Sequence, residues 1–363
     1  MDEAILGGSL EAPEREAFER VLRKLRRGEL GGRPPGVEEP LRPGDVEPWP
    51  LEGGPRWAEL EATGEEALRR GEVGSLVVAG GAGTRFGAAV KALVPVLGDR
   101  TFVALKLEDA RRAGDAAGRP APVAIMTSAS TQEAVDAEVA GAEEVLVFRQ
   151  RSLPRLTRAL ELWLDAGGRP SLAPAGHGDV FRALRDSGVG EALRARGVRT
   201  LLFSNVDNLA ATLDPVPLGA HLALGAALTV EVTARRSPAG ALDAGAAPVR
   251  LGGRVRLVEQ VEPAGHPLIS TNNLWLDLDR VLAGPVELPW RVVEKTVEGQ
   301  EVLQLEQVAG EITAVDGPDG RPALPAAYLE VPREPPAASR FEPVKRREDL
   351  PAVAARLRER LTG

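Results

Sequence analysis

Short apolar runs and amphipathic stretches alternate through the middle of the chain. Short continuous apolar runs are typical of strands that are buried on both faces of a sheet. Four such runs are residues 76–79, 122–126, 145–148 and 200–203. Helical spacing of apolar residues is found at 131–139 and again from residue 180 onward. This alternation predicts an α/β fold built on a doubly wound, mostly parallel sheet of the Rossmann-like type.

The two ends of the chain follow other patterns. Residues 9–28 and 57–70 have the apolar spacing of helices, and the segment between them is rich in Pro and Gly. Beyond residue 225 we expect strands at 228–234 and 269–276, a β-hairpin at 248–261, a short helix at 302–308 and a final helix at 348–361. The sheet is therefore expected to carry added β-hairpins.

The composition excludes several classes of function. The 363 residues are 43% hydrophobic, which is enough for a substantial core, and the net charge of −8 gives no electrostatic support for binding nucleic acid. The chain has no cysteine, which excludes disulfides and thiolate chemistry. The N-terminus lacks the features of a signal peptide, and no apolar run approaches the ~18 residues of a membrane span. We expect a cytoplasmic protein with neither a membrane nor a nucleic acid as partner.

Arginine supplies almost all of the positive charge, which makes the few lysines informative. A compact ammonium suits a single phosphate oxygen, whereas the arginine side chain is a planar fork. Lys24 and Lys106 lie in charged, helix-like stretches and are expected to be solvated. Lys91, Lys295 and Lys345 are the candidates for binding phosphate.

A glycine cluster follows the first buried strand directly. Gly80, Gly81, Gly83 and Gly87 allow the backbone to turn sharply and to bring its N–H groups close to an anion, and Lys91 lies shortly after them. The order of strand, glycine loop and lysine predicts a phosphate cradle. The loop is neither a P-loop nor a dinucleotide fingerprint, and a simple turn in a chain with 40 glycines is the alternative.

Polar side chains gather where the predicted parallel strands end. Thr127, Ser128, Gln150 and Asp207 each follow such a strand, and ligands of open α/β sheets bind beyond these carboxyl ends. The carboxylate of Asp207 is a hard oxygen ligand suited to Mg²⁺ that bridges phosphates. The alternative for Asp207 is a turn or helix-capping role.

Two further positions have unusual surroundings. His177 lies between two glycines, which would allow it to donate to a phosphate or a sugar hydroxyl; an ordinary loop histidine is the alternative. Asn272 and Asn273 lie within a predicted strand, where asparagine is disfavoured. Their amides need polar partners, which could be sugar hydroxyls or a neighbouring backbone.

Seven segments, in the same order as in the family, resemble the eukaryotic-type UTP–glucose-1-phosphate uridylyltransferases, also called UDP-glucose pyrophosphorylases. Together they are specific, although each alone would be a weak signal. They are residues 80–84 with Lys91, 148–155, 174–179, 204–212, 271–275, 295–306 and 339–345.

The resemblance implies a nucleotide-diphospho-sugar transferase fold in three parts. Residues 1–73 would form an N-terminal helical region with its connector, and residues 74–330 the catalytic nucleotidyltransferase domain. Residues 331–363 would supply a phosphate-binding lysine and a terminal helix. The implied ligands are UTP and a sugar 1-phosphate, and the implied cofactor is Mg²⁺.

The resemblance also implies a role for individual residues. Lys91, Lys345 and Arg85 would act on phosphates in catalysis, and Asp207 would hold the metal. Gln150 and Gly176 would contact the uracil, His177 the sugar phosphate, and Asn272 or Asn273 the glucose hydroxyls. The full set of implied substrate-binding residues is Val78, Ala79, Gly80, Gly81, Gln150, Gly176, His177, Asn205, Val206, Asp207, Asn272, Asn273 and Lys295.

The chain departs from the family at two places. Its glycine loop, with Arg85, is more similar to the loop of UDP-N-acetylhexosamine pyrophosphorylases, whereas Gly-His-Gly-Asp at 176–179 and Ser-Asn-Val-Asp-Asn at 204–208 are similar to the glucose enzymes. The chain ends soon after Lys345, so the C-terminal left-handed β-helix of many family members is expected to be absent. A monomer or a weak dimer is expected in consequence.

The reaction implied by the resemblance is in-line attack of a sugar-phosphate oxygen on the α-phosphorus of UTP. The sugar phosphate has its second pKa near ~6 and is ionised at neutral pH, so a general base is not required. Two alternatives stay open. The sugar could be galactose or N-acetylglucosamine, or the chain could be a non-catalytic sensor that binds a UDP-sugar.

Overall fold

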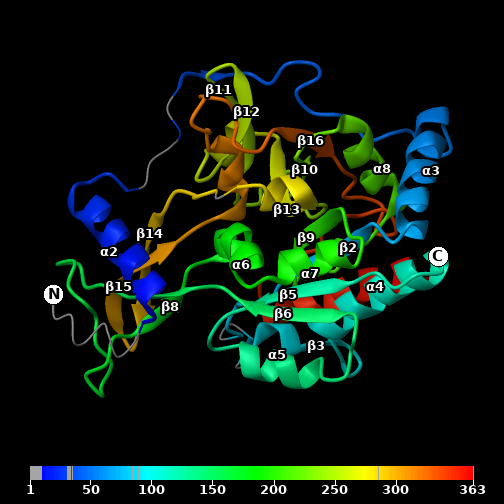
Figure 1. The fold of residues 1–363 in the computed structure, drawn as a ribbon. Coiled ribbons are helices and arrows are strands. Elements are labelled where there is room, and N and C mark those ends of the chain that lie inside the picture. Colours follow the sequence, from blue (N-terminus) through cyan, green and yellow to red (C-terminus); the bar gives the residue numbers. More distant parts are fainter. Residues whose placement is uncertain are drawn as a thin grey trace.

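The computed structural model has a seven-stranded sheet at its centre (Figure 1). Across the sheet the strand order is β16-β10-β13-β9-β2-β5-β6. The bounds of these strands are β2 Val73–Val78, β5 Val123–Thr127, β6 Val145–Arg149, β9 Thr200–Asn205, β10 Leu228–Ala234, β13 Leu268–Asp277 and β16 Ala326–Glu330. The residues that the structure describes are 10–30, 34, 36–83, 86–87, 90–284 and 286–362.

The sheet is mostly parallel, as the sequence predicts. β9, β2, β5 and β6 are parallel to one another, and β16 is parallel to β10. β13 runs antiparallel to both of its neighbours, β10 and β9. The four parallel strands therefore have their carboxyl ends at one edge, where Asn205 ends β9 and the glycine loop leaves β2.

Both faces of the sheet are covered, which explains the continuous apolar runs. In β5, Val123 and Ile125 pack into one apolar cluster, whereas Ala124 and Met126 pack into the other. Side chains alternate between the faces of a strand, so a run without polar residues is what a strand buried on two sides requires. The fold class expected from the sequence is confirmed.

Helices form the two covering layers (Figure 1). Residues of α4, α5 and α10 pack in the first cluster, and residues of α6, α7 and α9 pack in the second. α3 and α8 pack against each other, and α8 also contacts β10 and β16. The helix bounds are α3 Pro55–Arg69, α4 Phe102–Ala117, α5 Gln132–Glu138, α6 Val180–Asp186, α7 Val189–Ala195, α8 Pro215–Leu224, α9 Leu278–Leu282 and α10 Leu350–Thr362.

Smaller sheets and one helix lie outside this core. α2 (Ala12–Arg26) buries Phe18 and Leu22 in a separate cluster with residues of β7 and β15. The small pairings are β3–β4, β7–β8 and β14–β15, together with β1-β11-β12. Their bounds are β1 Glu38–Glu39, β3 Pro95–Leu97, β4 Arg100–Thr101, β7 Ser152–Pro154, β8 Leu172–Pro174, β11 Ala247–Leu251, β12 Arg254–Val258, β14 Arg291–Val297 and β15 Gln300–Glu306.

Short 3₁₀ helices connect several of these elements. Two of them, η2 (Lys91–Leu93) and η3 (His177–Asp179), carry candidate site residues. The others are η4 Pro263–Gly265, η5 Ala309–Ala314 and η6 Arg347–Asp349.

The helix expected at 302–308 is wrong, because this segment belongs to strand β15. β15 pairs with β14 in register, with Val297 opposite Gln300. Glu298 and Gly299 form the turn between them and both have positive φ, +51° and +76°. Positive φ at two central residues is what a tight type I′ hairpin requires. The added hairpins expected from the sequence are therefore present, with one more than the pattern indicated.

None of the helices in the described part of the chain has both the length and the apolar character needed to cross a membrane.

Candidate active site

The carboxyl edge of the parallel strands brings several of the sequence-predicted residues together. Gln150 follows β6, the glycine loop follows β2, and Asn205 ends β9. Val78 and Val206 are linked directly, because the N–H of Val206 donates to the carbonyl of Val78 at 3.1 Å. The N–H of Ala79 donates to the carbonyl of Met126 at 2.8 Å, which ties the start of the loop to β5.

Gln150 connects the glycine loop to the segment around His177. Its side chain is buried, and Oε1 accepts a hydrogen bond from the N–H of Gly176 at 2.9 Å. The amide nitrogen then lies against Gly80, where a Cβ atom would overlap it. Gly80, Gln150 and Gly176 therefore form one contact cluster, which we call the amide cluster.

The segment 176–179 is held from two sides. Gly176 has φ +91°, and a Cβ on it or on Gly178 would collide with the backbone of Gln307. The fully buried carboxylate of Asp179 accepts hydrogen bonds from the backbone N–H and the Nε of Arg151 at 2.7 and 2.8 Å. These contacts fix the backbone on both sides of His177.

The tautomer of His177 follows from its hydrogen bond. Nδ1 lies 3.2 Å from the backbone N–H of Ala309, which can only donate, so Nδ1 accepts and the proton is on Nε2. Burial lowers the pKa of His177 to about 4, so the ring is neutral at physiological pH. His177 is thus suited to donate one hydrogen bond through Nε2.

Lys91 and Asp207 form an ion pair at the same edge. Their side chains are only 19% and 16% exposed. Lys91 is the first residue of η2, and its Nζ also lies 5.0 Å from the centre of the Phe86 ring. A cation and a carboxylate are therefore held side by side beyond the ends of β2 and β9.

The two asparagines of β13 have different environments. Asn272 has φ +59°, lies where the register between β10 and β13 shifts, and donates through Nδ2 to Asn205 Oδ1 at 3.1 Å. Asn273 is fully buried, and its amide contacts Glu231, Asn208 and the carbonyl of Arg340. All donors and acceptors of the Asn273 side chain are used inside the protein, so Asn272 is the better candidate for a ligand contact.

The other two candidate lysines pair with carboxylates of their own. Lys345 Nζ lies 3.7 Å from Asp243, and Lys295 Nζ lies 3.8 Å from Glu306 across the β14–β15 hairpin. Their side chains are 51% and 43% exposed. The backbone next to Lys345 still lies beside the site, because the N–H of Val344 donates to the carbonyl of Asp207 at 3.3 Å.

Of the remaining predicted residues, Gly81 has a described contact and Arg85 does not. Gly81 accepts a hydrogen bond from the N–H of Lys91 at 3.3 Å, which closes the glycine loop onto η2. Arg85 lies outside the described residues.

The expectation that Lys106 is solvated is wrong. Lys106 lies on the buried face of α4, is 3% exposed, and donates to Ser204 and to the carbonyl of Ala211. The signal was present in the sequence, because residues 102, 103, 106 and 110 have the spacing of one helix face and the others on it are apolar.

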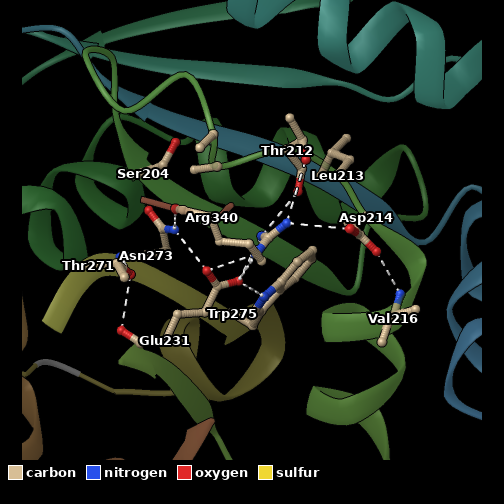
Figure 2. A network of polar contacts seen from close by, with 12 residues as sticks. Ser204, Thr212, Leu213, Asp214, Val216, Glu231, Thr271, Asn273, Trp275 and Arg340 are labelled. Atoms are coloured by element: carbon tan, nitrogen blue, oxygen red, sulfur yellow. Dashed lines mark hydrogen bonds and ion pairs between the residues drawn. The ribbon is translucent and has the colours of Figure 1, made fainter. Parts of the chain in front are cut away.

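A buried polar network was also missed (Figure 2). Arg340 and Glu231 form an ion pair in which both side chains are at most 1% exposed. Trp275 and Asn273 donate to the same carboxylate at 2.9 and 2.8 Å, and Arg340 also donates to the carbonyl of Thr212. The network connects segment 339–345 to the loop that follows β9. Arg340 and Glu231 are 109 positions apart, and no sequence motif links them. The ion pair could therefore not be predicted from the sequence.

A divalent cation would have few protein ligands at this site. Within the described ranges, no three His, Cys, Asp or Glu side chains come together as a ready-made metal site. Asp207 is a single hard oxygen ligand, already close to a cation. Such a carboxylate fits Mg²⁺ of the kind that is held by one or two carboxylates and by substrate phosphates.

Comparison with known proteins identifies the family of the chain. The profile of the family described as UTP–glucose-1-phosphate uridylyltransferase matches residues 56–360. The potato protein of that name is 31% identical over 303 residues, covering 77% of this chain and 60% of the potato protein. The chain spans 57–61% of the length of the curated relatives it matches.

Solved structures share the fold. UDP-glucose phosphorylase of Trypanosoma brucei superimposes with a TM-score of 0.73 at 24% identity, over 97% of this chain and 77% of that one. The uridine diphosphate N-acetylglucosamine pyrophosphorylase of the same organism gives 0.74 at 23% identity, over 94% and 75%. The fold is therefore common to proteins that act on different sugars.

Proposed function

The chain belongs to the UTP–glucose-1-phosphate uridylyltransferase family, and from this premise we propose that it transfers a uridylyl group from UTP to glucose 1-phosphate. One observation carries the proposal. The Lys91–Asp207 pair and the amide cluster lie at the same edge of the sheet, which supports roles in binding phosphate and base at one site.

The reaction needs no proton transfer. A phosphate oxygen of glucose 1-phosphate forms a bond to the α-phosphorus of UTP, and the bond from that phosphorus to the bridging oxygen breaks. The electron pair leaves with pyrophosphate. The attacking phosphate is already ionised because its second pKa is near ~6. The neutral His177 is consistent with this, since it serves as a donor and not as a base.

The chain's own residues bind and align the two substrates. The backbone of Val78–Gly81, the side chain of Gln150 and the backbone of Gly176 would hold the uridine. Asn272 and Asn205 would contact the sugar hydroxyls, and His177 would donate to the sugar phosphate. Binding of this kind accelerates the reaction by placing the oxygen and the phosphorus in line before attack.

Positive charge would stabilise the transition state. Lys91 is preorganised by its pairing with Asp207. Lys345 and Lys295 have long, partly exposed side chains, so a substrate phosphate could replace Asp243 or Glu306 as their partner. Arg85 would act on the same phosphates. Mg²⁺, held by Asp207 and phosphate oxygens, would supply further charge neutralisation.

Pyrophosphate release from UTP tests the proposal. Purified protein would be given UTP with glucose, galactose or N-acetylglucosamine 1-phosphate, with Mg²⁺ or with a chelator. We expect release with glucose 1-phosphate in the presence of Mg²⁺ and none with the chelator. Release only with another sugar would correct the substrate and keep the reaction. Tight binding of UDP-glucose without any release would support a sensor instead.

A matched pair of glycines tests the amide cluster. Gly80→Ala should weaken uridine-nucleotide binding by about 10-fold, because the new Cβ displaces the amide of Gln150 from Gly176. Gly265→Ala adds the same methyl group at an exposed position in η4, where nothing lies within 4 Å of it. Calorimetric titration with UDP-glucose measures both. Equal affinities of the two variants would contradict the assignment of Gln150.

A further inference from the structure

Lys106 is a buried cation for which the proposed reaction has no use. It is 3% exposed, on a face of α4 that also buries Phe102, Val103 and Ala110. Burying an ammonium costs free energy unless its donors are satisfied. The role of the Lys106 side chain is therefore inferred from the two groups to which its ammonium donates.

Both contacts are made to the loop that carries Asp207. Nζ donates to Ser204 Oγ at 3.0 Å and to the carbonyl of Ala211 at 2.8 Å. Ser204 is in β9 directly before Asn205, and Ala211 lies in the loop between β9 and α8. One ammonium group thus links the two ends of segment 204–211. This segment contains both Asn205 and Asp207.

We propose that Lys106 is a positioning residue that fixes segment 204–211, and through it Asp207, in the geometry required for uridylyl transfer. The inference rests on the proposed function but adds a residue to it. Misplacement of a reacting group by about 1 Å can cost about 10²-fold in rate, so a support of this kind affects turnover more than binding.

The charge of Lys106 is sensitive to pH. Burial lowers the pKa of its ammonium to about 7. Asp109 and Asp207 oppose this effect, whereas Arg340 and Arg360 add to it. As pH rises through about 7 the ammonium becomes a neutral amine, and charge-assisted hydrogen bonds, which are roughly twice as strong, become ordinary ones. The loop is therefore held more firmly below this pH than above it.

The test compares Lys106→Met with wild type. Methionine fills the space of the aliphatic stem but cannot donate. At pH 6 we expect kcat to fall by about 10-fold with KM changed by less than about 3-fold, and the difference from wild type to shrink by pH 9. Lys24→Met makes the same substitution at an exposed lysine and should change neither constant.

Ser204→Ala keeps the proposal testable if Lys106→Met does not fold. It removes a single hydroxyl, and we expect a smaller loss of kcat with the same pH dependence. In the double variant the two losses should be less than additive, because both variants remove the hydrogen bond between Lys106 and Ser204. A Lys106→Met enzyme with the kcat of wild type from pH 6 to 9 would overturn the inference. Equal losses of kcat at every pH, with KM unchanged, would refute the pH-sensitive support and would still support the positioning role.

A direct titration separates this inference from the proposed function. The chain has five lysines, so labelling their Cε atoms with ¹³C gives a simple NMR spectrum in which Lys106→Met identifies one signal. We expect that signal to titrate near pH 7. Wild-type protein that releases no pyrophosphate would refute the proposed function and would leave this titration unaffected. Active wild type with a Lys106 signal that titrates above pH 10 would refute the pH-sensitive support alone.

Discussion

Replacing Lys91 with methionine should lower kcat for pyrophosphate release by about 10²–10³-fold, or about 3–4 kcal/mol of transition-state stabilisation. The charge of Lys91 is preorganised, because it pairs with Asp207 and lies over the Phe86 ring, with a side chain only 19% exposed. A fixed charge in a partly desolvated site stabilises developing phosphate charge more than a mobile one in water. Methionine preserves the packing of the stem and removes only the charge.

Two control variants show whether the loss of kcat in Lys91→Met comes from the missing positive charge at this position. Lys24→Met removes a lysine that is exposed on α2 and should leave kcat unchanged. Lys91→Arg keeps a positive charge in a different shape and should retain part of the activity. Steady-state kinetics at saturating UTP measure all three, and the thermal midpoint shows whether each is folded. Near-normal turnover by a folded Lys91→Met enzyme would remove Lys91 from the mechanism.

The sheet was predictable because its signal is local. Each parallel strand is a short apolar run followed by a polar cluster, and burial on both faces requires that pattern whatever lies next to it. The same reasoning brought Gln150 and Asp207 to one edge, since parallel strands end on the same side. What the sequence could not provide is the pairing between side chains, such as the ion pair of Lys91 and Asp207.

One error occurred where an element depends on pairing with another strand. Strand β15 has its apolar residues close together, and only pairing with β14 makes it a strand. The Glu298-Gly299 turn was the local clue to that hairpin, since glycine readily adopts positive φ. Lys106 was misjudged for another reason: charge was given more weight than its position on an apolar helix face.

The two asparagines of β13 show a third limit. Regular strand alternation does not decide which of Asn272 and Asn273 faces a ligand, because Asn272 has φ +59° and lies at the register shift between β10 and β13. The sequence does not show this irregularity. The choice depends on Glu231 and Arg340, whose buried network takes up the amide of Asn273.

Replacing Arg340 with methionine should lower the free energy of unfolding by about 3–5 kcal/mol, the largest stability effect we expect. Arg340 and Glu231 are almost completely buried and are joined by hydrogen bonds of 2.7 to 3.0 Å (Figure 2). Without Arg340 the carboxylate of Glu231 keeps only Trp275 and Asn273 as side-chain donors, and a buried charge loses its counter-ion. Chemical denaturation measures the change, with Arg321→Met as the control because that side chain is 86% exposed.

The double variant separates the cost of an unpaired charge from the net contribution of the pair. Glu231→Met alone should also be strongly destabilising, because it leaves the guanidinium with Asp214, at 3.7 Å, as its nearest recorded carboxylate. With both residues changed to methionine no charge is left unpaired, so the loss should be smaller than that of either single variant. If the double variant instead loses as much stability as the two single variants added together, the two side chains are not energetically coupled. The cost would then lie in the lost hydrogen bonds to Thr212, Trp275 and Asn273, and not in an isolated charge.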